Sequence, residues 1–256
     1  MVGNRNRPAS GLGCGAAQYI GSMVFTAFRE WESWLPGRCA VCHAWPSNAV
    51  CEDCVRQFGQ PRTRCRTCAA SLPQTLTQCG ACLRQPPPLA AVLAAVDYDY
   101  PWANMVRDFK FHADIAWARS FARMMRSTPW VDPALEAADW IVPMPLSKQR
   151  LLERGFNQSA VLAAALETGA SRKVRHYVLV RIRDTAAQSS LPRSERQANV
   201  AQAFAVHPDW FSALRGKKVV LVDDVMTTGA SLHAAAQALA QAGAAQTVAL
   251  VFARTP

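Results

Sequence analysis

Hydrophobic positions in the second part of the chain alternate between short apolar runs and longer segments with helical character. Residues 90–100, 139–145, 217–225 and 245–254 are apolar runs typical of buried strands. Helices are predicted over residues 102–125, 157–169 and 231–243. This alternation predicts an α/β fold with a mainly parallel twisted sheet covered on both faces, and such sheets bind ligands at the carboxyl ends of their strands.

The first 92 residues have a different pattern. Apolar residues between 18 and 36 recur with the spacing of one helix face, which we interpret as packing surface. Three consecutive prolines within residues 84–90 cannot extend a helix or a central strand, and they mark a linker. The predicted organisation is a helical segment over 1–35, a cysteine-rich module over 36–84, a linker over 85–92 and an α/β domain over 93–256.

Eight of the nine cysteines fall into four Cys-x-x-Cys pairs. The pairs are Cys39 and Cys42, Cys51 and Cys54, Cys65 and Cys68, and Cys79 and Cys82. Two such pairs supply the tetrahedral four-sulfur shell that zinc prefers, so the spacing favours two structural zinc ions over a disulfide framework or an iron–sulfur cluster. The simplest partition of the ligands is sequential, and the spacing also allows an interleaved one. With few apolar residues between the pairs, the metal would supply much of the folding free energy of this module.

Composition also gives the net charge of the protein and predicts its location in the cell. The formal net charge is +10, and 23 of the 28 basic residues are Arg, which suits bidentate contacts to phosphate. An anionic partner and an incidentally basic surface both explain this charge. The chain has no run of about 18 apolar residues that could span a membrane, and its N-terminal segment lacks the apolar core of a signal peptide. We therefore expect no membrane insertion and a cytoplasmic location.

Candidate chemistry concentrates in residues 219–231, VVLVDDVMTTGAS. A helix N-terminus with Gly229 and three hydroxyl side chains suits a terminal monophosphate. Because Asp223 and Asp224 would repel that phosphate, we expect them to contact sugar hydroxyls or a hydrated Mg²⁺. A sugar phosphate with a free diol would fit both the helix N-terminus and the two acids. A nucleoside triphosphatase would also need a G-x-x-x-x-G-K-[ST] segment, which the sequence lacks, and the chain after Asp224 is too short for a receiver domain.

This stretch resembles the phosphoribosyl-pyrophosphate (PRPP) motif of type I phosphoribosyltransferases. More closely, residues 34–254 resemble the ComF family, in which a double zinc ribbon precedes such a domain. The matching segments are WLPGRCAVC, FKFHAD, IVPMPLSKQRLLERGFNQS, RIRDTAAQSSLPRSERQANVAQAF and VVLVDDVMTTGASL. The resemblance implies the type I phosphoribosyltransferase fold preceded by a small N-terminal double zinc ribbon.

The resemblance also implies roles for individual residues. Asp223 and Asp224 would hold the ribose diol together with Mg²⁺. The 5′-phosphate would be held by Thr227, Thr228, Gly229, Ala230 and Ser231, and the pyrophosphate by the segment that contains Pro145, Lys148 and Arg150. Residues 181–199 match the loop that closes over such sites, and we expect this loop to be mobile when the site is empty. From it, Arg193 and Arg196 would help the two acids to stabilise a cation-like sugar.

Two function classes follow from the resemblance. The first is an enzyme that transfers the phosphoribosyl group of PRPP to an unknown acceptor, with acceptor recognition expected within residues 97–130. The second is a non-catalytic, PRPP-sensing protein that binds single-stranded nucleic acid, because ComF members are linked to DNA uptake and natural transformation. Arg-rich surfaces bind phosphate backbones, so single-stranded DNA and the DNA-uptake machinery are expected partners beside PRPP.

Overall fold

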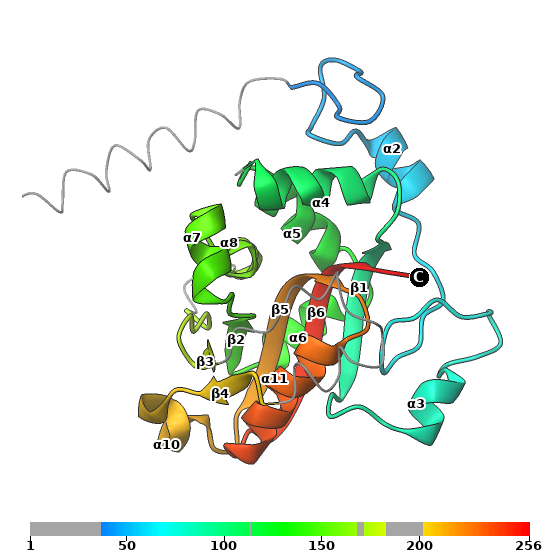
Figure 1. Cartoon of the computed structure of the whole chain (residues 1–256). Helices are drawn as coiled ribbons and strands as arrows, with labels where there is room; N and C mark the ends of the chain where they lie inside the picture. Colours follow the sequence, from blue (N-terminus) through cyan, green and yellow to red (C-terminus); the bar gives the residue numbers. More distant parts are fainter. Residues whose placement is uncertain (1–36, 113, 168–171, 183–201) are drawn as a thin grey trace, which may run out of the picture. The chain divides into compact units, whose positions relative to one another are not determined.

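The computed structural model describes residues 37–112, 114–167, 172–182 and 202–256 (Figure 1). The chain divides into two compact units, residues 1–51 and 52–256. The described part of the first unit is a short irregular segment, in which Gly37 forms an isolated antiparallel bridge with Ser47. In the described ranges, no helix has the length and apolar character that crossing a membrane requires.

A four-stranded sheet forms the centre of the second unit, with its strands in the order β1-β6-β5-β2 (Figure 1). The strands are β1 (Ala91–Asp97), β2 (Trp140–Pro143), β5 (Lys218–Met226) and β6 (Gln246–Arg254). All three pairings are parallel, and Val220 of β5 lies opposite Ile141 of β2 and Val248 of β6. The four apolar runs therefore form one sheet, and the predicted parallel α/β fold is confirmed. Because β1 begins at Ala91, it includes the last two residues of the expected linker.

Helices cover both faces of this sheet. The helices of the second unit are, in chain order, α2 (Glu52–Phe58), α3 (Gly80–Arg84), α4 (Trp102–Phe111), α5 (Trp117–Arg126), α6 (Val131–Ala137), α7 (Lys148–Arg154), α8 (Gln158–Leu166), α10 (Phe211–Leu214) and α11 (Ala230–Gln241). Val251 of β6 belongs to the same buried cluster as Leu232 of α11, whereas Phe252 stacks on Phe121 of α5 with ring centroids 3.8 Å apart. Successive strand residues point to opposite faces, so α11 covers one face and α5 the other. Helix α8 contacts β2 and β5 and also packs on α5.

The helical stretch expected over residues 102–125 forms two helices, α4 and α5, rather than one. Helix α4 ends at Phe111 with His112 as its cap, and α5 begins at Trp117. The break between them allows Phe109 and Phe121 to meet edge to face, with ring centroids 5.6 Å apart. Packing of two short amphipathic helices on the sheet therefore replaces one straight helix.

The segment after β2, which the resemblance assigns to the pyrophosphate, includes a helix. From Lys148 onward it folds as helix α7. The Ser147 side chain accepts a hydrogen bond from the backbone N–H of Arg150, and Gly155 ends the helix in the left-handed region with φ 76°. A Ser cap and a left-handed Gly are common helix boundaries, so local capping decides this segment.

A second, two-stranded sheet carries the ends of the expected closing loop. Strands β3 (Leu179–Arg181) and β4 (Phe204–Val206) pair in antiparallel fashion, with Leu179 opposite Val206. Residues 183–201 between them, including Arg193 and Arg196, lie outside the described residues.

Candidate functional site

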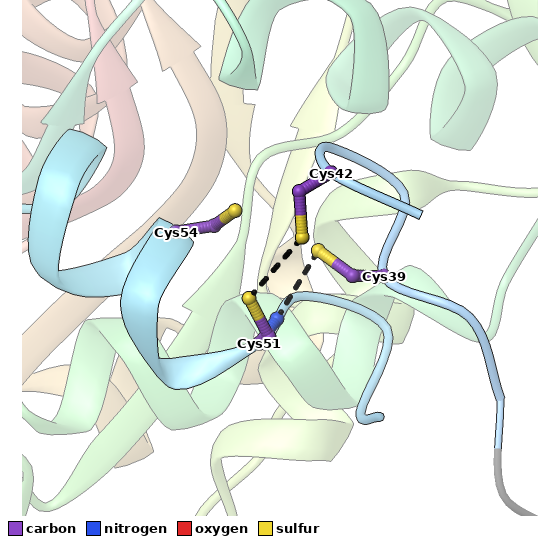
Figure 2. A group of neighbouring side chains, drawn as sticks. All are labelled: Cys39, Cys42, Cys51 and Cys54. Atoms are coloured by element: carbon purple, nitrogen blue, oxygen red, sulfur yellow. Dashed lines mark hydrogen bonds between the residues drawn. The ribbon is translucent and has the colours of Figure 1, made fainter. Parts of the chain in front are cut away.

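The eight paired cysteines gather in two groups that follow their order along the chain. In each group the four sulfur atoms all lie within 4.8 Å of one another. The groups are Cys39, Cys42, Cys51 and Cys54, which Figure 2 shows, and Cys65, Cys68, Cys79 and Cys82. Zinc–sulfur bonds of about 2.3 Å in a tetrahedron place sulfurs about 3.8 Å apart. The observed distances of 3.6 Å between Cys42 and Cys51 and 3.7 Å between Cys68 and Cys79 fit that geometry, so each group could hold structural zinc.

The thiols in these groups have divergent proton affinities. Burial raises the pKa of Cys39, but backbone N–H donors, including that of Cys51 at 3.3 Å, lower it to about 6 overall. Cys65 behaves in the same way and also reaches about 6, with the N–H of Cys79 3.3 Å from its sulfur. Burial and the neighbouring sulfurs raise the pKa of Cys82. A divalent cation at the centre of each group would stabilise all four thiolates, because its charge outweighs this mutual repulsion.

A second candidate site lies near the carboxyl end of β5, where Asp223 and Asp224 occupy adjacent positions. Asp223 Oδ1 accepts hydrogen bonds from Ser159 Oγ at 2.8 Å and from the N–H of Asp224 at 3.0 Å. Asp224 Oδ2 lies 3.0 Å from the Nζ of Lys110 on α4. Burial, reinforced by the Asp224 carboxylate, raises the pKa of Asp223 to about 7 against the opposing effects of Lys110 and Ser159. Residues of α4 and α8 therefore hold the two acids in place.

Residues 227–231 lead from β5 into α11 and place the positive end of this helix beside the acids. Gly229 caps α11 in the left-handed region with φ 84°. A Cβ on Gly229 would meet the Met226 methyl group and would lie 3.0 Å from the Nε2 of His233. The position therefore requires glycine both for its backbone conformation and for the space around it.

One cavity of about 260 Å³ brings the acids and this loop together. Its lining includes Tyr98, Lys110, Pro145, Arg150, Arg154, Gln158, Ser159, Arg181, Asp223, Asp224, Thr227, Gly229, Ala230 and Ser231. Two residues singled out from the sequence, Thr228 and Lys148, are not among its lining residues. Thr228 instead supports the loop, because its Oγ1 lies 3.4 Å from the backbone N–H of Ala230. We call this cavity the acid-pair pocket.

Sequence reasoning missed three residues that organise the pocket. Lys110 and Ser159 contact the acids directly, although both lie in segments that resemble the family. Arg254, at the end of β6, is buried and donates to the backbone carbonyl of Met226 at 3.3 Å and to that of Cys68 at 3.1 Å. It thereby links the end of β5, where the loop 227–231 begins, to the second cysteine group. Its only sequence signal is a lone Arg that ends an apolar strand.

A larger cavity of about 520 Å³ lies along β1 and shares no lining residue with the acid-pair pocket. Its lining is mostly apolar with three arginines, of which Arg62 and Arg64 already pair with Asp97 at 3.1 and 2.7 Å. None of its described lining residues is acidic, so it offers no carboxylate to a sugar diol. The acid-pair pocket is therefore the candidate sugar-phosphate site.

Comparison with known proteins agrees with the phosphoribosyltransferase fold that the sequence predicted. The family model of the phosphoribosyl transferase domain matches residues 154–256. DNA utilization protein YhgH of Salmonella typhimurium is 31% identical over 222 residues, which cover 82% of this chain and 94% of that protein. Competence protein ComFC of Bacillus subtilis is 32% identical over 154 residues, which cover 58% of this chain and 59% of that protein. The chain belongs to the ComF family.

A further relative of this ComF chain is competence protein F of Haemophilus influenzae, with 27% identity over 80% of this chain and 92% of that protein. The matches fit the architecture found here. A phosphoribosyltransferase domain with a mainly parallel sheet follows two four-cysteine groups that are compatible with a double zinc ribbon. The ComF resemblance drawn from the sequence is thus confirmed.

Proposed function

We propose that this ComF protein binds PRPP in the acid-pair pocket and is a phosphoribosyltransferase-like protein linked to DNA uptake. The observation that carries the proposal is that Asp223, Asp224 and four of the five residues of the loop 227–231 meet in one cavity. The loop supplies hydroxyls and a helix N-terminus to the 5′-phosphate. The carboxylates accept hydrogen bonds from the ribose diol, a part of the ligand that carries no negative charge.

Basic residues of the same pocket suit the diphosphate of PRPP. Arg150 and Arg154 of α7 and Arg181 of β3 all line it. The Arg154 guanidinium lies over the Phe111 ring, 5.0 Å from the ring centroid, which restricts its position. We assign the diphosphate to these arginines and to the backbone around Pro145.

The pocket and the cysteine groups fit two kinds of metal. Asp223 and Asp224 present carboxylate oxygens, the ligands that Mg²⁺ prefers. We propose that these two carboxylates would hold Mg²⁺ together with PRPP, and the bound ion would supply positive charge to the pyrophosphate leaving group. The two four-cysteine groups would each hold one structural zinc, and Cys-x-x-Cys zinc modules favour a cytoplasmic location.

Transfer chemistry is the first of two candidate activities. Loss of pyrophosphate from the anomeric carbon leaves a cation-like sugar, which the adjacent carboxylates would stabilise. An acceptor bound near the described part of residues 97–130 would then attack that carbon. Pyrophosphate release in the presence of a panel of bases tests this activity, and PRPP binding without pyrophosphate release for any base added would argue for PRPP sensing instead.

Nucleic-acid binding is the second candidate and the link to DNA uptake. It is supported by the net charge of +10 and by the names of the relatives, a DNA utilization protein and two competence proteins. An Arg-rich surface would bind single-stranded DNA through its phosphates. PRPP binding would then report nucleotide supply to a protein that handles DNA.

Calorimetry with PRPP tests the binding site. Replacing Asp223 or Asp224 with Asn removes a charged hydrogen-bonding partner, which costs about 1.5–3 kcal/mol, so affinity should fall about tenfold to hundredfold per residue. Asp209→Asn is the matched control, because this carboxylate is 81% exposed and does not line the pocket. Equal PRPP affinities of the wild type and the Asp223→Asn, Asp224→Asn protein would refute the assignment.

A further inference from the structure

Lys110 occupies a place that follows from the packing of α4. The buried residues of this helix, Trp102, Met105, Val106 and Phe109, recur three or four positions apart and face the core. Phe109 packs against Phe121 at 5.6 Å and against Phe156 at 5.9 Å between ring centroids. Because its neighbour is anchored in this way, Lys110 emerges at the border of the core, and its side chain is only 18% exposed.

The two acids are held by different partners. Asp223 takes neutral donors, the Ser159 hydroxyl and the N–H of Asp224. Asp224 has a side chain that is 3% exposed, and its Oδ2 meets the Lys110 ammonium at 3.0 Å. Among the described residues, no other cation forms an ion pair with either acid within 4.0 Å. Lys110 is therefore the described cation in direct contact with the pair, whereas the Arg154 guanidinium acts on both acids from farther away.

This contact matters for a ligand as anionic as PRPP. Two adjacent carboxylates repel each other, and a buried carboxylate without a partner is strongly disfavoured. We propose that Lys110 is a positioning residue of the sugar-phosphate site, which fixes the Asp224 carboxylate so that both acids can accept hydrogen bonds from the ribose diol. This inference rests on the PRPP-binding function proposed above. Lys110 acts through Asp224, because its ammonium lies 3.0 Å from this almost fully buried carboxylate.

Comparison of two ligands separates this role from a direct contact between Lys110 and the diphosphate of PRPP. Ribose 5-phosphate keeps the diol and the 5′-phosphate of PRPP but lacks the diphosphate. Calorimetry at a fixed Mg²⁺ concentration should show that Lys110→Met weakens the binding of both ligands by a similar factor, about tenfold or more. Lys110→Arg keeps the charge and should restore most of the affinity. The matched control is Arg107→Met, which removes a positive charge from an exposed position of the same helix and should leave both affinities unchanged.

A double substitution tests whether Lys110 acts through its partner. In an Asp224→Asn background, Lys110→Met should cause little further loss, because the carboxylate that Lys110 fixes is gone. Three results would overturn the inference: loss of PRPP binding alone with ribose 5-phosphate unaffected, an equal loss in both backgrounds, or no loss in Lys110→Met. Failure of the wild type to bind either ligand would instead refute the proposed function, and the inference with it. Thermal unfolding of each variant checks the fold, and Lys110→Gln, which also removes the charge, replaces Lys110→Met in the comparison if the latter is unstable.

Discussion

Replacing Gly229 with Ala perturbs the loop 227–231 at one backbone position. Gly229 caps α11 with φ 84°, a conformation that L-residues rarely adopt. The added Cβ would lie 3.0 Å from His233 Nε2 and closer still to the Met226 methyl group. Met226 is 2% exposed, so the methyl group has little room to move aside. The substitution therefore combines backbone strain with steric overlap.

The two contributions can be estimated separately from the structure. A left-handed residue with a Cβ costs about 1–2 kcal/mol. Overpacking in a closed environment adds about 1–3 kcal/mol. Gly216 offers a matched control, because its φ is 74° but nothing lies within 4 Å of the position that its Cβ would take. Gly216→Ala should therefore lower the free energy of unfolding by only about 1–2 kcal/mol, the cost of backbone strain. Gly229→Ala should lower it by about 2–5 kcal/mol.

Urea unfolding and PRPP calorimetry measure these effects. Gly216→Ala should lower the free energy of unfolding slightly and leave PRPP affinity unchanged, since Gly216 does not line the acid-pair pocket. Gly229→Ala should lower stability more and also weaken PRPP binding, because relief of the overlap moves the loop that we propose to hold the 5′-phosphate. Equal destabilisation by the two substitutions, with unchanged PRPP affinity in both, would refute this account of the loop.

Three further predictions concern metal, pH and nucleic acid. The purified protein should carry about two zinc ions and no iron by elemental analysis, and Cys68→Ser should lose one zinc whereas Cys14→Ser should lose none; a zinc content near zero in the wild type would contradict the two sites. Because burial raises the pKa of Asp223 to about 7, this carboxyl stabilises the folded protein below about pH 4, and its contribution is lost as the pH rises through about 7. The wild type should therefore lose unfolding free energy relative to Asp223→Asn between about pH 4 and 7.5, and parallel pH profiles would argue against a raised pKa. Binding of a labelled single-stranded oligonucleotide should be weak, independent of sequence and lower by orders of magnitude at about 200 mM salt than at about 50 mM, and a flat salt dependence would mean that the basic charge is incidental.

Features set by neighbouring residues could be predicted from the sequence. The β5 strand, the two acids and the loop into α11 are contiguous, and their strand–loop–helix geometry depends on local hydrophobicity and one glycine. The cysteine pairs are local in the same sense, because each Cys-x-x-Cys pair directs two sulfurs toward one point. Both patterns therefore indicated the chemistry before any fold was known, although the spacing alone left the partition of the cysteines open.

Features set by distant residues needed the tertiary structure. Lys110 and Asp224 are far apart in the sequence, and they meet only because α4 packs beside the carboxyl end of β5. Arg254 likewise reaches the carbonyls of Cys68 and Met226 only after the sheet has formed. The break between α4 and α5 was missed as well, because the packing of Phe109 on Phe121 outweighs the continuous helical pattern. Local sequence patterns thus predicted the ligand chemistry of the chain. Tertiary packing decided which cations and donors complete the site. Ion pairs and ring contacts between distant residues leave no periodic signal in the sequence, so they could not be predicted from it.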